Sequence, residues 1–259
     1  MEVVLCQDAS DAACRAVDAV EALLREKPDA VLGLPTGSTP LLMYGELARR
    51  CAAGTLSLAK ASTFNLDEYI GLPEGHPGSY AAYMKRNLID KTDLRISHAF
   101  LPAGRAKDLE AASREYEDRI RTAGGIDLQI LGIGLNGHIG FNEPGSSLKS
   151  RTRVKTLSSA TLAANIKDFD GAEPPTMALT MGIATILEAR RILLIATGAS
   201  KADAVREMAE GPLSANCPAS ALQLHEKTAV LADPSAASLL KNKDYYQRSQ
   251  ALQARLKGA

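Results

Sequence analysis

The chain has 259 residues, and its 30 basic and 30 acidic residues give a formal net charge of zero. This balance excludes a generally basic surface of the kind that binds nucleic acid or an anionic membrane, so basic groups must act locally. The length suits one large α/β domain as well as two small ones.

The start of the chain and its cysteines bear on compartment and metals. Residues 1–8 contain neither a basic segment nor a long apolar core, and no run reaches the roughly 18 apolar residues of a membrane span. We therefore expect a cytoplasmic protein without a membrane partner. The four cysteines and four histidines lack metal-type spacing, which predicts reduced thiols and no metal site.

The first elements in chain order are a strand, a helix and a second strand. Val3–Leu5 is a short apolar strand, and an amphipathic helix follows over about Asp11–Glu26 with Asp8 or Ser10 as its cap. Pro28 ends this helix, and an apolar strand comes next.

That second strand runs into Pro-Thr-Gly-Ser-Thr-Pro, which leads to the start of a helix at about residue 41. Pro40 suits the first turn of the helix. Free N–H groups there, the flexible Gly37 and three hydroxyls could wrap a phosphate; the hydroxyls belong to Thr36, Ser38 and Thr39. An ordinary helix cap explains the same residues. The segment is neither a Walker loop nor G-x-G-x-x-G, so a nucleotide is not implied.

A third strand, Ala61–Leu66, ends at two adjacent carboxylates, Asp67 and Glu68. Side chains of neighbouring residues point in different directions, so at most one of the pair faces a ligand. A solvated turn acid is the alternative for either residue, and the residues alone do not choose between them.

The middle of the chain repeats the alternation of helix and strand. A helix opens at His76–Tyr80, a strand lies near His98–Leu101, a helix covers Asp108–Thr122, and Ile126–Ile133 is another apolar strand. This spacing predicts a parallel sheet covered by helices.

The loop at 134–144 follows that last strand and interleaves glycines with His138, Glu143 and two asparagines. Loops at the carboxyl ends of parallel strands form ligand sites. His138 is a natural proton carrier near neutral pH, and Glu143 is close enough to hold its imidazole in one tautomer. A turn or a buried histidine would explain His138 alone, but not the whole polar set.

The last third of the chain adds basic residues and further strands. Arg151, Arg153 and Lys155 alternate, and on a strand they would line one face, usually a solvated edge. A strand-to-helix turn with Lys201 is a second candidate phosphate contact. Strands are expected at Met177–Met181, Arg191–Ala196, Pro218–Leu224 and Thr228–Ala232, and an amphipathic helix at about Ala236–Leu256.

Three separate stretches resemble the motifs of the glucosamine-6-phosphate deaminase family. G-L-N-G-H-I-G-F-N-E-P at 134–144 is closely similar to its signature loop, G-L-P-T-G-S-T-P at 33–40 to a substrate-site segment, and F-N-L-D-E-Y at 64–69 to its second signature. The resemblance runs from about residue 30 to 232. It implies an α/β, modified Rossmann-like three-layer fold, with a mostly parallel central sheet and helices on both faces, as a single domain over residues 1–259 with a lid at about 157–177.

The resemblance also implies a reaction, which converts D-glucosamine 6-phosphate and water to D-fructose 6-phosphate and ammonia in N-acetylglucosamine catabolism. It needs neither metal nor organic cofactor. Asp67 is the base that moves a proton from C2 to C1, and His138 opens the pyranose ring, oriented by Glu143. Some relatives carry Asp at the position of Asn136, so we keep Asn136 in the ring-opening group as a hydrogen-bonding residue and not as a proton acceptor.

Other site residues follow from the same resemblance. Lys167, in the segment similar to the lid, and Lys201 stand where relatives contact the substrate phosphate. Ser146, Arg153 and Lys155 fall where some relatives bind the activator N-acetylglucosamine 6-phosphate at a subunit interface. Because the tail is short and different, we favour a monomer over a hexamer, with a small phosphosugar as the partner.

Three other functions stay open. A 6-phosphogluconolactonase shares the fold and a G-x-x-x-G-H loop, but its pattern lacks F-N-E-P. A galactosamine-6-phosphate isomerase differs by one epimeric hydroxyl, which no motif reads. A catalytically silent sugar-phosphate sensor is disfavoured because Asp67, His138 and Glu143 are retained together.

Overall fold

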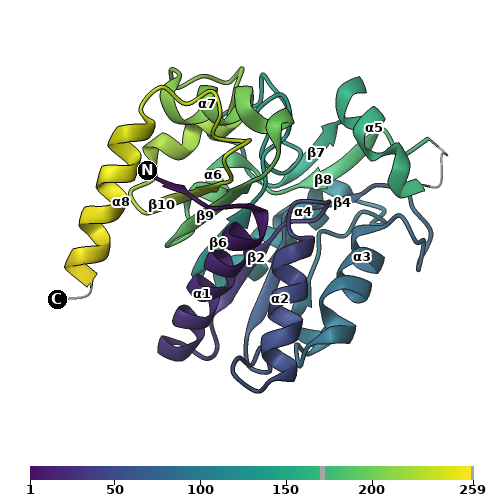
Figure 1. The fold of residues 1–259 in the computed structure, drawn as a ribbon. Coiled ribbons are helices and arrows are strands. Elements are labelled where there is room, and N and C mark those ends of the chain that lie inside the picture. The colour runs from purple at the N-terminus through teal and green to yellow at the C-terminus, as the bar shows by residue number, and fades with distance from the viewer. Residues whose placement is uncertain (170–172, 258–259) are drawn as a thin grey trace.

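The computed structural model describes residues 1–169 and 173–257, apart from the side chains at 167, 168, 254 and 257. Within these residues, seven parallel strands form one sheet in the order β1-β10-β9-β6-β2-β3-β5 (Figure 1). Their bounds are β1 Glu2–Leu5, β2 Val31–Leu34, β3 Ser62–Asn65, β5 Ala99–Phe100, β6 Leu128–Leu131, β9 Ile192–Ala196 and β10 Thr228–Ala232. The predicted parallel sheet is confirmed.

Helices cover both faces of this sheet. One apolar core lies between the sheet and α1 (Ala9–Glu26), α2 (Leu41–Ala52) and α3 (Tyr80–Asn87), which stand side by side in Figure 1. A second core lies against α4 (Leu109–Thr122), α6 (Ile183–Leu187) and α7 (Ala202–Glu210). Strands β2, β6 and β9 are buried along their whole length because helices shield both faces. The three-layer α/β architecture is therefore confirmed.

Short polar side chains set the starts of two long helices. Asp8 caps α1 by accepting a hydrogen bond from the Asp11 N–H at 2.8 Å. Asp108 caps α4 in the same way, accepting from the Ala111 N–H at 2.8 Å. Each carboxylate satisfies an N–H that the helix itself cannot pair, so these two starts could be predicted from sequence.

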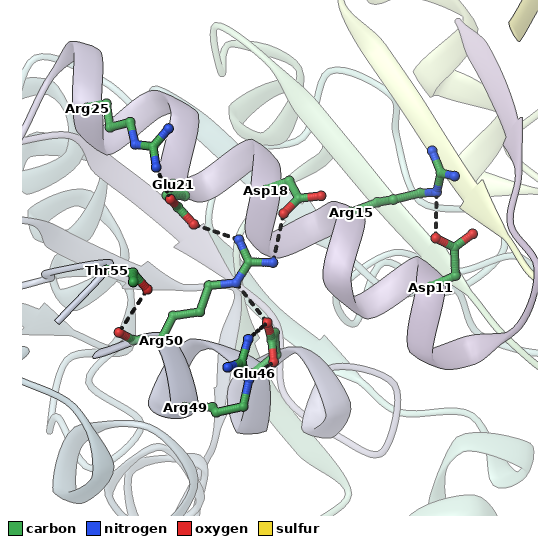
Figure 2. Close-up of polar contacts among 9 residues, drawn as sticks. All are labelled: Asp11, Arg15, Asp18, Glu21, Arg25, Glu46, Arg49, Arg50 and Thr55. Atoms are coloured by element: carbon green, nitrogen blue, oxygen red, sulfur yellow. Dashed lines mark hydrogen bonds and ion pairs between the residues drawn. The ribbon is translucent and has the colours of Figure 1, made fainter. Parts of the chain in front are cut away.

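Charged side chains tie α1 to α2 on the outer surface of their layer (Figure 2). Arg50 of α2 reaches Asp18 at 2.7 Å and Glu21 at 2.6 Å, both on α1. It also contacts Glu46 of its own helix at 2.7 Å, and Arg49 shares that carboxylate. The Arg50 side chain is 15% exposed, so one guanidinium joins three carboxylates in a partly shielded position.

A smaller antiparallel sheet, which the sequence did not predict, contains strands β4 (Asp67–Tyr69), β8 (Met177–Thr180) and β7 (Arg153–Thr156), in that order. It lies beside α5 (Ser159–Asn165) in Figure 1. Its register pairs Thr180 with both Asp67 and Arg153. Because β4 begins two residues after β3 ends, the small sheet starts at the carboxyl edge of the large one.

Two predictions near the carboxyl end of the chain were wrong. Pro218–Leu224 forms the 3-10 helix η5 and not a strand, since Pro218 lacks an N–H for a sheet and sits at the helix start. The last helix, α8, spans Lys243–Lys257 and not residues from 236, because the Asp233 carboxylate caps an intervening turn through the Ala236 N–H. The remaining 3-10 helices are η1 Ile89–Lys91, η2 Ile96–His98, η3 Ile166–Phe169 and η4 Ala199–Lys201.

Helix α8 packs along the β1 edge of the sheet (Figure 1). The Leu5 N–H of β1 donates a hydrogen bond to Gln250 Oε1 at 3.2 Å. Among the described residues, none of the helices is long and apolar enough to cross a membrane.

Candidate active site

A cavity of about 320 Å³ opens at the carboxyl ends of β2, β6 and β9. Its walls come from six segments of the chain that lie apart in sequence, several of them loops that meet at one edge because the strands are parallel. The polar residues lining it include Thr36, Gly37, Ser38, Thr39, Asp67, Tyr80, Asn136, His138, Thr161, Asn165, Ser200 and Lys201. A larger cavity, of about 750 Å³, lies beside α4 and α6 at the opposite edge of the sheet and contains none of the predicted site residues.

The loop after β6 carries the imidazole of His138. Two backbone hydrogen bonds hold this loop against η5 and the segment before it: Ala219 N–H donates to Gly137 O, and Gly145 N–H donates to Ala215 O, both at 2.8 Å. The His138 ring lies directly over Gly134, where an added Cβ would come within 2.3 Å of it. The loop is therefore built around the ring position.

His138, Asn136 and Glu143 form one group. The Asn136 amide donates to Glu143 Oε2 at 2.8 Å, and Asn136 Oδ1 accepts the His138 backbone N–H at 3.3 Å. Glu143 Oε2 lies 3.7 Å from His138 Nδ1, slightly beyond hydrogen-bond length, and Nδ1 has no partner among the described residues. Asn136 thus holds the carboxylate next to the ring.

Glu143 also receives hydrogen bonds from the start of α5. Its Oε1 accepts from the Ser158 N–H at 3.2 Å, the Ser158 hydroxyl at 3.0 Å and the Thr161 hydroxyl. Burial alone would raise the pKa of Glu143, but interactions with His138, Thr161 and Asn136 outweigh it and hold the pKa below its ordinary value. The carboxylate is therefore anionic at neutral pH, beside an imidazole that can become charged.

Asp67 lies in β4, is only 5% exposed, and lines the cavity. Burial, assisted by the neighbouring Glu68 charge, raises the pKa of Asp67 to about 8, although hydrogen bonds from Phe141 N–H and the Thr180 hydroxyl oppose the shift. Glu68 points elsewhere and accepts the N–H groups of Tyr80 at 3.0 Å and Ala81 at 2.9 Å at the start of α3. Of the two adjacent acids, the one selected by resemblance is the one at the cavity.

The hydroxyl-rich loop after β2 and the turn after β9 form another wall. The Tyr83 hydroxyl anchors the first loop by donating to Gly37 O at 2.6 Å. Helix α2 has no side-chain cap, so the Thr36, Ser38 and Thr39 hydroxyls are not used as an ordinary helix cap. Ser200 and Lys201 face the same cavity. The side chain of Lys167 lies outside the described residues.

The three candidate activator residues lie outside this cavity. Ser146 is 2% exposed, and its hydroxyl has no hydrogen-bond partner within the described chain. The solvated-edge interpretation is wrong for Arg153, whose guanidinium is half-buried and donates to Asn142 Oδ1 at 2.9 Å. Lys155, two residues on, is partly exposed. Arg153 thus contacts the loop that carries His138.

Several cavity residues had no signal in the sequence. Tyr80 at the start of α3, and Thr161 and Asn165 in α5, line the cavity without belonging to a recognisable motif. Tyr69, which packs behind them, accepts a hydrogen bond from the Asn165 amide at 2.9 Å. Only the tertiary fold brings these residues to the site. Among the described residues, no three His, Cys, Asp or Glu side chains gather as a metal site would need.

Comparison with known proteins shows the family of this chain. The family described as glucosamine-6-phosphate isomerases/6-phosphogluconolactonase matches residues 7–231, a longer span than the motifs alone indicated. The chain is 50% identical over 250 residues to the glucosamine-6-phosphate deaminase of Arthrobacter sp. (strain FB24), covering 96% of both chains. It is 52% identical over 248 residues to that of Colwellia psychrerythraea, covering 95% of this chain and 92% of the relative.

Solved structures give the same result. A monomeric glucosamine-6-phosphate deaminase superimposes with a TM-score of 0.89 at 48% identity, covering 92% of this chain and 100% of that one. The 6-phosphogluconolactonase of Trypanosoma cruzi reaches 0.75 at 18% identity, covering 93% and 97%, which shows a shared fold alone. The chain therefore belongs to the glucosamine-6-phosphate isomerase and 6-phosphogluconolactonase family.

Proposed function

We propose that this protein converts D-glucosamine 6-phosphate and water to D-fructose 6-phosphate and ammonia, as a step of amino-sugar catabolism. One observation carries the proposal: the Asp67 carboxyl and the His138 imidazole, from separate elements, line one cavity, with Glu143 held beside the imidazole. Relatives named glucosamine-6-phosphate deaminase, at about 50% identity, support the same substrate.

His138 and Glu143 suit the ring-opening step. The imidazole takes the proton from O1 of the pyranose and returns one to O5, which needs a group that can both accept and donate a proton. The anionic Glu143, 3.7 Å from Nδ1, stabilises the imidazolium that forms in between. Asn136 holds Glu143 in place and acts by hydrogen bonding.

Asp67 suits the proton transfer that follows. As a carboxylate it removes the C2 proton of the open-chain sugar, giving an enolamine, and returns a proton to C1. The resulting C2 iminium adds water and releases ammonia. Neither a metal nor an organic cofactor is needed for these steps.

The opposite end of the substrate carries the phosphate. We assign its binding to the loop of Thr36, Gly37, Ser38 and Thr39 and to Lys201, with Lys167 as a further contact. N–H groups at the uncapped start of α2 also favour an anion. Binding energy at the phosphate positions the reacting carbons against Asp67 and His138.

We further propose a single domain whose segment at about 157–177 is a lid. Glu143 accepts hydrogen bonds from Ser158 and Thr161 at its first end. At η3, the Phe169 ring packs on Tyr69 and His76, with centroids 5.3 and 5.7 Å apart. These contacts support a closed position of the lid over the cavity.

Activation by N-acetylglucosamine 6-phosphate at Ser146, Arg153 and Lys155 is the second candidate role. The buried hydroxyl of Ser146, which has no hydrogen-bond partner among the described residues, favours it, whereas the contact of Arg153 with Asn142 gives that cation a different use. We propose a cytoplasmic protein and favour a monomer.

The deciding experiment is an ammonia assay on the purified protein. Glucosamine 6-phosphate and its C4 epimer galactosamine 6-phosphate are compared by ammonia release, each with and without N-acetylglucosamine 6-phosphate, and 6-phosphogluconolactone is tested in parallel by loss of the lactone. We expect glucosamine 6-phosphate to give ammonia and fructose 6-phosphate in equal amounts. Ammonia from the C4 epimer alone would reassign the substrate, and release from neither amino sugar would overturn the proposal.

A further inference from the structure

Thr180 sits at the centre of the small sheet, between two residues of the site region. The register of β8 places it directly opposite Asp67 of β4 on one side and Arg153 of β7 on the other. Directly paired residues of antiparallel strands present their side chains on the same face. Thr180 is fully buried, at 0% exposure, so its hydroxyl must be paired within the protein.

The Thr180 hydroxyl lies close to both Asp67 and the loop that carries His138. Phe141 N–H donates to Thr180 Oγ1 at 3.0 Å. A Cβ on Gly140 would lie 3.0 Å from Thr180 Oγ1 and 3.4 Å from Asp67 Oδ2, so both oxygens approach the same spot on the loop backbone. Gly140 also has a positive φ of 55°, which favours glycine there.

The direction of the hydrogen bonds follows from this arrangement. Since Thr180 Oγ1 accepts the Phe141 N–H, its single proton is available to an acceptor. Two acceptors lie within reach of this proton: Met181 O, at 3.4 Å, and the Asp67 carboxyl, whose pKa is lowered by a hydrogen bond with Thr180. A hydroxyl that donates to a carboxylate stabilises the ionised form.

We propose that Thr180 is a positioning residue for the reaction, whose hydroxyl fixes the Asp67 carboxylate against the loop carrying His138 and favours its ionised form. The inference rests on the proposed function, because it takes Asp67 as the base. A base must be ionised to accept the C2 proton, and burial of Asp67 opposes ionisation. Thr180 offsets part of that opposition without adding a charge.

Other groups near Asp67 would remain in place if the Thr180 hydroxyl were removed. Glu68 follows Asp67 on the same strand. Tyr80 of α3 and Tyr116 of α4 interact electrostatically with the Asp67 charge, and His138 and Lys201 line the same cavity. Arg153 lies two strands away. Since none of these changes with Thr180, a shift in the titration of Asp67 would report the hydroxyl itself.

The test compares Thr180→Val, which keeps the shape but removes the hydroxyl, with Thr180→Ser, which keeps the hydroxyl. The rate of ammonia release from glucosamine 6-phosphate is measured from pH 5.5 to 9.5. A hydrogen bond to a charged group predicts that Thr180→Val moves the acidic limb of kcat/KM up by about one pH unit and lowers kcat at pH 7 roughly tenfold. We expect KM to stay within about twofold and Thr180→Ser to behave like the wild type.

Thr185→Val is the matched control. Thr185 is also buried, and its hydroxyl also donates to a carboxylate, Glu117 at 2.7 Å, but away from the active-site cavity. This variant should leave the pH profile unchanged. If Thr180→Val does not fold, Thr180→Ala carries the same expectation.

Two outcomes would overturn the inference: a hydroxyl-free variant with the wild-type profile, or a Thr180→Ser variant as impaired as Thr180→Val. Both require an active wild-type enzyme. Wild-type protein that releases no ammonia would instead contradict the proposed function.

Discussion

Asp67 combines two opposing requirements at the scale of a single residue. The proposed reaction needs its carboxylate, whereas its burial raises the pKa to about 8 and so favours the neutral acid. Such a conflict is common where a protein tunes an acid or base to its task. The pH dependence of activity and of stability should therefore carry opposite signs at this residue.

The variant Asp67→Asn tests the effect of this residue on activity and on stability. A raised pKa in the folded state contributes stability that is fully present below the unfolded value of 3.8 and is lost as pH rises to about 8. Asparagine does not titrate and so does not lose this stability. We therefore expect the free energy of unfolding of Asp67→Asn, relative to that of the wild type, to rise by on the order of a few kcal/mol between pH 4 and pH 9. Urea denaturation at several pH values measures the gain.

The same variant should lose exchange of the C2 proton with solvent by roughly a thousandfold or more while still binding substrate. Deuterium incorporation followed by NMR measures this loss. Wild-type exchange rates would remove Asp67 from its assigned role, whereas a stability difference that does not grow with pH would contradict its raised pKa.

Arg153 offers a second prediction. Its guanidinium donates to Asn142 Oδ1, and the fully buried Asn142 donates in turn to Ile139 O at 2.9 Å and Met181 O at 2.8 Å. Arg153→Gln leaves the amide oxygen poorly paired, so we expect a loss of about 1–3 kcal/mol in stability. We also expect a roughly tenfold lower kcat, because the loop carrying His138 loosens.

Lys155→Gln is the control, since Lys155 lies on the same strand two residues on and no hydrogen bond joins it to Asn142 within the described contacts. Denaturant titration and initial rates are the measurements. If Arg153→Gln keeps its stability and basal rate and loses only a response to N-acetylglucosamine 6-phosphate, Arg153 is an activator contact.

Single residues were predictable where a motif named them. His138 and Glu143 stood out because a merely structural turn has no need of so many polar groups. Asp67 could not be separated from Glu68 without the resemblance, since their difference depends on which face of β4 meets the cavity. Tyr80 and Thr180 gave no signal, because their roles arise from partners distant in sequence.

At the scale of elements, the Arg50 cluster joins α1 to α2 (Figure 2). Arg50→Ala leaves Glu21 and Glu46, each 13% exposed, without their shared cation, so we expect a loss of about 1–3 kcal/mol. Arg49→Ala is the control, because Arg49 is 66% exposed and contacts Glu46 alone in this cluster. Thermal unfolding of both variants measures the difference.

The cluster should also respond to pH. Hydrogen bonds from Arg49 and Arg50 lower the pKa of Glu46 to about 2. Its contribution is therefore present above the unfolded value of 4.5 and is lost as pH falls toward 2. Equal effects of Arg49→Ala and Arg50→Ala would show that the contact between the helices adds nothing.

The lid gives another prediction at this scale. A Cβ on Gly78 would come within 2.7 Å of the Phe169 ring, so Gly78→Ala should displace Phe169 from its contact with Tyr69. We expect a KM raised about three- to tenfold and faster proteolysis near residues 159–169, because the closed position becomes less favourable. Gly45→Ala, in open space on α2, is the control. Unchanged KM and unchanged proteolysis would contradict the lid.

The larger sheet was predictable because a pattern of apolar strands alternating with amphipathic helices fits few architectures other than a parallel sheet covered by helices. The small sheet was not. Strand β4 has three residues, and its partner β8 lies more than 100 residues away, so no local pattern marks the pair. The run at Pro218–Leu224 misled for the opposite reason: it is apolar and buried like a strand, yet proline starts a 3-10 helix there.

At the scale of the whole molecule, the cavity is lined by the loops after β2, β3, β6 and β9 together with residues of α3 and α5. We predict that a single copy of the chain is active. We expect sedimentation to give a mass near 27.4 kDa, with a specific activity that does not change on dilution. A larger assembly whose activity falls as it dissociates would contradict this.

The position of α8 has a consequence for solubility. A sheet that does not close into a barrel leaves hydrogen-bonding groups exposed at its two rims, where another molecule can add a strand. At one rim the strand β5 is only two residues long. At the other rim, the side chain of Gln250 on α8 accepts a hydrogen bond from the Leu5 N–H of β1. A chain shortened before residue 243 would uncover β1 and should precipitate or polymerise where the full-length protein stays dispersed.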